Sequence, residues 1–134
     1  MDTSDKIVSP HHIAFVLVPN YSLIAFASAL EPLRVANQIC EARVYSWSCH
    51  THDGNPVSAS NGLLTQPDGS IDAISGAELV VVCAGLDVER YKQPNALLSR
   101  LRYLATHGAM IGAICTGSYV LAKAGLLNGY RCTI

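Results

Sequence analysis

Residues 109–118, AMIGAICTGS, pass from a short apolar run directly into a turn of small residues. The first six are apolar without alternation, which is typical of a strand covered on both faces. Residues 119–124 then follow a helical pattern, and Gly125 is a stop signal behind them. The stretch therefore predicts a buried strand that turns abruptly into a helix at Cys115.

The N-terminal third of the chain begins with a similar change of period. Residues 12–18 form an apolar run that ends at a Pro-Asn pair, and apolar side chains then recur at three-and-four spacing over residues 22–38. We expect a strand followed by an amphipathic helix, with a kink or a break at Pro32, which lies inside the pattern. Residues 43–50 predict a second strand.

The middle of the chain contains the strongest strand signal. Residues 53–72 are rich in Gly, Asn, Ser and Pro but keep returning to apolar residues, which predicts a hairpin or an excursion at the sheet edge. Residues 78–85, ELVVVCAG, predict a buried strand, and helical leucine spacing follows up to Gly108 at a C-cap. A last strand is expected to begin over residues 130–134.

Alternating strands and helices predict right-handed βαβ units, hence an α/β fold with a doubly wound, mostly parallel sheet and helices on both faces. The chain has 134 residues, a net charge of −1, 50% hydrophobic residues and only 14% charged residues. These values fit one domain and exclude a disordered chain. The scattered basic residues also exclude a nucleic-acid surface on this segment, because phosphate binding needs clustered Lys and Arg.

The N-terminus and the cysteines indicate a cytoplasmic protein. Residues 1–10 form a polar lead without the basic-then-apolar pattern of a secretory signal, and runs such as residues 79–84 are too short to cross a membrane. The five cysteines are odd in number and contain no C-x-x-C pair. We therefore expect a reducing compartment, no disulfide framework, no zinc ribbon and no membrane partner.

Ligands of open α/β sheets bind at the carboxyl ends of the strands, where two small-residue turns are expected here. One contains Gly85 and Leu86, and the other contains Cys115 and Thr116. Backbone N–H groups near Gly85, Leu86 and Thr116 are positioned to hold an oxyanion or a carboxylate. Cys115 falls on a nucleophile elbow, where the following helix favours the thiolate, so it is either a reactive thiol or an inert small core residue.

Other polar and aromatic residues allow two interpretations each. His50 and His52 alternate on a strand beside Asp53, which fits either a two-histidine metal site or, as favoured here, a solvent-facing strand end. Tyr45 and Trp47 fit either generic core packing, which we favour, or an aromatic wall for a quaternary ammonium.

The remaining histidines are expected to have structural positions. His11 and His12 precede the first strand as an exposed lead, and His107 ends a helix, where a cation suits the helix dipole. No cofactor and no metal ligand set is predicted.

Two motifs carry a resemblance to a known group of proteins. Residues 112–118, GAICTGS, with residues 121–129, LAKAGLLNG, resemble the elbow segment of the class I glutamine amidotransferase-like superfamily, which includes the parkinsonism-associated deglycase and the intracellular protease family. Residues 30–37, LEPLRVAN, are similar to a helix in the N-terminal sensor domains of AraC-type transcription regulators. The resemblance spans residues 13–134 and implies a flavodoxin-like, amidotransferase-like fold, nearest to regulators of carnitine, glycine betaine and arginine catabolism.

The resemblance also argues against catalysis. Enzymes of the superfamily pair the elbow cysteine with a carboxylate from the first helix and, in several members, with a histidine after the next strand. The acid position corresponds to Ala25, and Glu31 lies too far along the helix to replace it. The histidine position would lie beyond Ile134. The implied site is a ligand pocket at Cys115, and not a catalytic centre.

The favoured hypothesis is an effector-sensing, homodimerising domain of an AraC-type regulator. It would bind an amino acid or quaternary amine at Cys115, Thr116, Gly85 and Leu86 without turnover. Residues 11–134 would be an incomplete sensor domain that stops within a strand, and DNA would be bound only by a helix-turn-helix domain absent from this chain. The alternatives are a cysteine-dependent hydrolase, hydratase or deglycase that uses Cys115, and a purely structural dimerisation domain with an empty pocket.

Overall fold

The structure, a computed structural model, describes residues 9–134, so that most of the polar lead at residues 1–10 lies outside the described residues. Seven strands, three α-helices and two short 3-10 helices follow one another within this range. In chain order they are β1 (His11–Leu17), α1 (Leu23–Cys40), β2 (Tyr45–Thr51), β3 (Val57–Ser58), β4 (Leu64–Thr65), β5 (Gly69–Ser70), η1 (Ile71–Ala73), β6 (Leu79–Cys83), η2 (Val88–Arg90), α2 (Asn95–Thr106), β7 (Met110–Ile114) and α3 (Gly117–Lys123).

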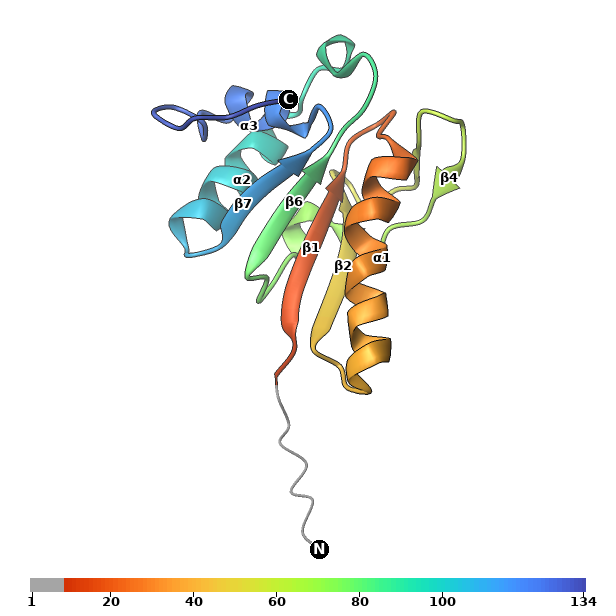
Figure 1. The fold of residues 1–134 in the computed structure, drawn as a ribbon. Coiled ribbons are helices and arrows are strands. Elements are labelled where there is room, and N and C mark those ends of the chain that lie inside the picture. The colour runs from red at the N-terminus through yellow and green to blue at the C-terminus, as the bar shows by residue number, and fades with distance from the viewer. Residues whose placement is uncertain (1–8) are drawn as a thin grey trace, which may run out of the picture.

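Five of the strands form one sheet in the order β5-β2-β1-β6-β7, and every neighbouring pair in it is parallel. From β1 the chain moves outward to β2 and β5, and it then returns to the other side of β1 as β6 and β7. Helix α1 covers one face of the sheet, whereas α2 and α3 cover the other (Figure 1). The predicted doubly wound α/β architecture is confirmed.

The two central strands divide their side chains between two cores. Alternate residues of β1, such as Ile13 and Phe15, join Phe26 of α1 in one apolar cluster. The residues between them, such as Val16, pack with Leu101 of α2 in the other cluster. Because successive strand side chains point to opposite faces, a run that is apolar throughout can supply both cores at once.

Helix α1 crosses its internal proline without a break. Pro32 lacks the N–H that would bond to the carbonyl of Ser28, and both residues are exposed, so that this carbonyl can face water. The 18-residue helix begins at the Ser22 cap, whose side chain accepts a hydrogen bond of 3.3 Å from Ala25 N. The helix break expected at Pro32 is therefore wrong.

The segment at residues 53–72 is the expected excursion at the sheet edge. Strands β3 and β4 form a separate antiparallel pair, and β5 then joins the outer side of β2.

The prediction of a strand over residues 130–134 is wrong. Those residues are exposed and contain no strand, although the outer edge of β7 is unpaired within residues 9–134.

A chain of polar side chains lies between β1 and β2. Ser48 Oγ lies 2.9 Å from His12 Nε2 and 2.7 Å from His50 Nε2, and Ser46 Oγ lies 2.8 Å from His12 Nδ1. The carbonyl of Ser70 can only accept, so the neutral His50 ring donates from Nδ1, at 2.9 Å, and accepts from Ser48 at Nε2. The network ties β2 to β5, and the bonds of His50 fit its uncharged ring.

Burial lowers the pKa of His50 from its ordinary value of 6.5, and the nearby His12 adds to this effect. The hydrogen bond to Ser70 and the charge of Asp68 act in the opposite direction. The unfolded chain therefore binds this proton more readily than the folded chain does, and acid favours unfolding.

We predict that the free energy of unfolding falls as the pH is lowered from 6.5, by up to about 1.4 kcal/mol for each unit by which the folded-state pKa is depressed. Urea titrations between pH 5 and pH 8 measure this effect. The His50→Gln variant should lose that part of the pH dependence, with His52→Gln, an exposed neighbour, as the matched control. An unaltered acid dependence in His50→Gln would contradict the prediction.

Candidate functional site

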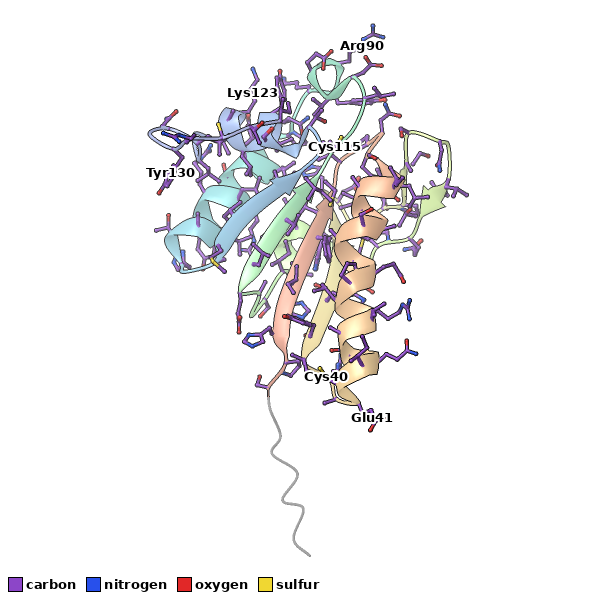
Figure 2. All side chains as sticks on the ribbon, viewed as in Figure 1. Cys40, Glu41, Arg90, Cys115, Lys123 and Tyr130 are labelled. Carbon is purple, nitrogen blue, oxygen red and sulfur yellow. The ribbon has the colours of Figure 1, made fainter. Side chains whose placement is uncertain are left out.

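Cys115 occupies the abrupt turn between β7 and α3. Its φ is 52°, in the left-handed region that non-glycine residues rarely adopt, and its side chain is exposed at the carboxyl edge of the sheet (Figure 2). Such strain at a strand-to-helix turn is the geometry of a nucleophile elbow. The predicted elbow is confirmed, and of the two interpretations left open for Cys115, an inert core residue does not fit its exposure.

Hydrogen bonds connect the three loops that follow β1, β6 and β7. Thr116 Oγ1 donates to the Gly85 carbonyl at 2.6 Å, which joins the two turns singled out from the sequence. Asn20 Nδ2 donates to the Leu86 carbonyl at 2.8 Å. The structure therefore brings Gly85 and Thr116 into direct contact, while the Leu86 side chain extends into solvent and is 72% exposed.

Two glycines permit this close approach of the loops. A Cβ on Gly85 would overlap the Asn20 carbonyl oxygen, and a Cβ on Gly117 would overlap the Val82 carbonyl oxygen. The loop after β1 therefore packs against the loop after β6, and the start of α3 packs against β6, at distances that only glycine allows.

The loops around the elbow contain backbone N–H groups without partners, and the Cys115 thiol has no side-chain partner within residues 9–134. The backbone N–H groups of Gly85, Leu86 and Thr116 donate to no backbone carbonyl in the loops of residues 9–134. No side chain in the same range hydrogen-bonds Cys115 Sγ. The first turn of α1 carries no acidic residue, because the position implied by the resemblance is Ala25. Within residues 9–134, no acidic or basic side chain is therefore hydrogen-bonded to the sulfur.

Cys40, Cys49 and Cys83 differ from Cys115 in their exposure or in their position in the fold. Burial raises the pKa of Cys49 to about 11, and it raises the pKa of the fully buried Cys83 further. Cys40 is exposed, but it ends α1 at the opposite edge of the molecule from Cys115 (Figure 2). Cys40 therefore provides a matched control for substitutions at the elbow.

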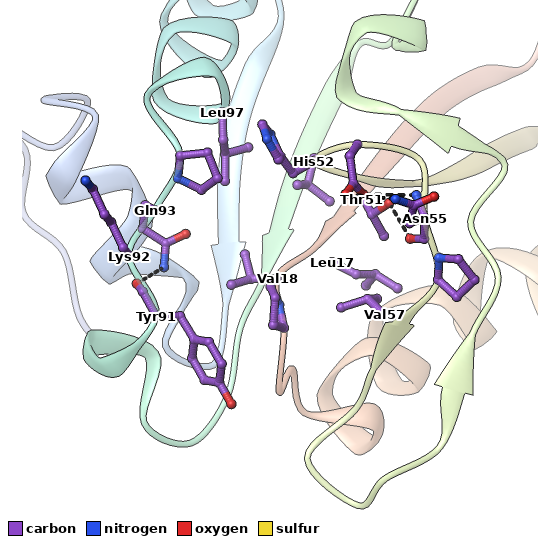
Figure 3. A pocket seen from close by; sticks show the side chains of 15 residues that line it. Leu17, Val18, Thr51, His52, Asn55, Val57, Tyr91, Lys92, Gln93 and Leu97 are labelled. Carbon is purple, nitrogen blue, oxygen red and sulfur yellow. Dashed lines mark hydrogen bonds between the residues drawn. The ribbon is translucent and has the colours of Figure 1, made fainter.

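A separate cleft lies between two loops near the carboxyl ends of β1 and β2. It has a volume of about 260 Å³ and lies between the loop after β2 and the segment that leads into α2 (Figure 3). Val16 and Val18 of the first strand region and Leu97 of α2 supply apolar lining, whereas Asp53 and Gln93 are among its polar residues. None of the four residues predicted to bind a ligand lines it.

Sequence reasoning missed this cleft because its walls are two loops. One signal was available, namely that β1 and β6 are followed by connections in opposite directions, which places a crevice at their carboxyl ends. Nothing in the pattern of residues 91–94 indicated that they would fold back toward the loop at residues 51–57.

The histidines of β2 do not form a pair at a metal site. His50 is buried, 3% exposed, and bonded to Ser48 and Ser70, whereas His52 lies beyond the end of β2 and is exposed. The prediction that His50 lies at a solvent-facing strand end is therefore wrong. Within residues 9–134, no three His, Cys, Asp or Glu residues gather where they could hold a metal ion.

The remaining aromatic and histidine residues have structural positions. Tyr45 and Trp47 pack partly buried against the α1-side core, which confirms core packing. His107 follows α2, and its Nδ1 lies 2.7 Å from the Tyr103 carbonyl, as expected for a helix end. His11 and His12 are not a lead, because they are the first residues of β1 and bond to side chains of other strands or loops.

The parallel sheet, the strained cysteine and the glycine contacts together define a flavodoxin-like α/β domain with a nucleophile elbow. The chain belongs to the DJ-1/PfpI family, whose family model matches residues 11–134. This membership confirms the superfamily resemblance. No helix of the described residues is long and apolar enough to span a membrane.

Several relatives are transcription regulators. The HTH-type transcriptional regulator GbdR of Pseudomonas aeruginosa is 41% identical over 126 residues, which cover 94% of this chain and 34% of that protein. The regulator CdhR of the same organism is 45% identical over 120 residues, 90% of this chain and 35% of that protein. A crystal structure of an AraC family transcriptional regulator from Pseudomonas putida has a TM-score of 0.80 at 30% identity, covering 92% of this chain and 65% of that chain.

An enzyme is also similar to part of the chain. The isonitrile hydratase of Pseudomonas putida is 32% identical over 78 residues, which cover 58% of this chain and 34% of that protein. The chain spans about a third of the length of the curated relatives described here.

We predict that Gly117→Ala destabilises the protein by about 1–3 kcal/mol, because the added methyl group must displace the β6 backbone at Val82. Gly112→Ala, on β7, is the matched control, since its Cβ would meet only Leu79 Cδ1 at 3.7 Å. Urea unfolding monitored by circular dichroism measures both variants. Equal stability of the two variants would show that α3 does not depend on this contact.

Proposed function

We propose that this domain is the effector-sensing and dimerising part of an AraC-type transcription regulator that controls catabolism of an amino acid or quaternary amine. The effector binds at the elbow, near Cys115, Thr116, Gly85 and Leu86, and leaves unchanged. DNA is contacted by a helix-turn-helix region elsewhere in the whole protein. Ligand binding acts through a difference in affinity between two arrangements of the domains.

The observation that carries this proposal is an elbow built without its acid. Cys115 is exposed and strained, and the loops around it offer three N–H donors, yet Ala25 stands at the acid position and no side chain of residues 9–134 bonds the sulfur. A site of this kind binds an anionic group without an acid or base to complete a reaction. The regulators among the relatives support the same conclusion.

A second candidate function is cysteine-dependent hydrolysis, hydration or deglycation at the same elbow. The exposure of Cys115 on a strained turn favours it, as does the partial similarity to an isonitrile hydratase. A third candidate is a structural dimerisation domain whose elbow binds nothing.

Thermal unfolding of the full-length protein with glycine betaine, carnitine and arginine tests these proposals. We expect one of them to raise the Tm, with a stabilisation of about 2.7 kcal/mol at a concentration one hundred times its Kd. Cys115→Ala should reduce that shift several-fold, and Cys40→Ala should not. Turnover of an isonitrile, glyoxal or ester substrate that is lost in Cys115→Ala would establish the enzyme, and the absence of any shift would leave the dimerisation domain.

A further inference from the structure

The cleft between residues 51–57 and residues 91–97 contains an acceptor without a partner in the described residues. Gln93 is only 8% exposed, and its Nε2 donates to the Tyr91 carbonyl at 3.1 Å. A carbonyl can only accept, so this bond assigns the nitrogen and leaves the oxygen on the other branch of the amide. Gln93 Oε1 has no hydrogen-bond partner among residues 9–134.

The unpartnered oxygen faces the cleft. Each fully buried side-chain oxygen or nitrogen in the described residues has a partner, so Gln93 Oε1 must reach open space. Figure 3 shows it on the branch of the amide that points toward the space beside Val18, away from Tyr91. This oxygen has no partner among residues 9–134 and is open to the cleft, so it can receive an N–H or O–H donor from a ligand in place of water.

A second acceptor stands on the opposite wall. Asp53 lines the cleft, and its carboxylate receives hydrogen bonds of 3.0 Å from the backbone N–H and from the side-chain Nδ2 of Asn55. The bond from the Asn55 backbone is the main cause that holds the pKa of Asp53 below its ordinary value, so the side chain is a carboxylate at neutral pH. Each of its oxygens keeps further acceptor capacity.

The lining between these acceptors is apolar. Val16, Val18 and Leu97 contribute to it, and Lys92 extends its amine away from this lining (Figure 3). The volume of about 260 Å³ is at the lower end of ligand pockets and suits a molecule with few heavy atoms. Gln93 and Asp53 therefore offer acceptors on the two walls, beside His52 and Lys92, and the apolar lining suits a short hydrocarbon chain.

We propose that the cleft between residues 51–57 and residues 91–97 is a second binding site, which takes a small aliphatic molecule with a primary ammonium group. The ammonium donates to Gln93 Oε1 and is attracted by Asp53, and the carbon chain covers Val16, Val18 and Leu97. A quaternary ammonium has no N–H to donate and leaves Gln93 unpaired. This site does not require that the elbow bind an effector.

Butylammonium and butyltrimethylammonium distinguish these chemistries, because they share a charge and a chain but differ in N–H groups. In ligand-observed NMR titrations of the full-length protein, we expect saturable binding of butylammonium with a Kd on the order of millimolar. The trimethyl analogue should bind about tenfold more weakly. Equal binding of the two, or binding of neither, would overturn the proposal.

Three variants locate the site. Gln93→Leu should weaken butylammonium binding about tenfold, and Gln66→Leu, at an exposed glutamine outside both sites, should leave it unaltered. Asp53→Asn alters an exposed side chain and should weaken binding several-fold, which keeps the test valid if Gln93→Leu fails to fold. Unaltered binding in both cleft variants would overturn the proposal.

The elbow and the cleft can be told apart by the Cys115→Ala variant. Loss of butylammonium binding in that variant would place the ligand at the elbow and overturn the cleft site, while the proposed sensor function stood. The converse result is also possible: butylammonium binds at the cleft, and no effector binds at the elbow. That result would support the cleft site and count against the proposed function.

Discussion

The pairing of β1 with β6 at the centre of the sheet is the constraint on which the rest of the structure depends. Both strands are buried over most of their length, and their registered neighbours, such as Phe15 and Val81, lie side by side. Because the chain leaves these two strands in opposite directions, their carboxyl ends cannot be covered by one continuous connection. The loops that meet there must instead bond to one another, and both candidate sites lie in that region.

The elbow follows from this constraint through backbone contacts. Gly85 and Gly117 let the loops after β1 and β6, and the start of α3, approach at distances that a Cβ would prevent. Thr116 then closes the gap with its bond to the Gly85 carbonyl. With its loops held in this way, Cys115 is kept at a positive φ by the surrounding structure. The strain belongs to the scaffold, and it persists whether or not an acid stands at Ala25.

The order and type of the buried elements could be predicted, because a fully apolar run such as residues 78–85 has few alternatives to a covered strand. The elbow could be predicted for a similar reason, since a strand that meets a small-residue turn leaves the intervening residue exposed. The break at Pro32 could not be judged from spacing, because its outcome depended on whether Ser28 faced water. The burial of His50 depended on hydrogen-bond partners from Ser48 and Ser70, and Ser70 lies twenty residues away.

The cleft illustrates a deeper limit of local patterns. Its unpaired acceptor exists because Gln93 bonds back to Tyr91 with one branch of its amide, and no periodicity predicts which branch is satisfied. Water can reach this oxygen in the empty domain, and a ligand that donates to it replaces the hydrogen bond of the displaced water. Ligands are distinguished at this oxygen, because a molecule without an N–H group that fills the cleft excludes water from the oxygen and supplies no hydrogen bond in its place. Selectivity in this cleft therefore arises from an acceptor to which the described residues supply no donor.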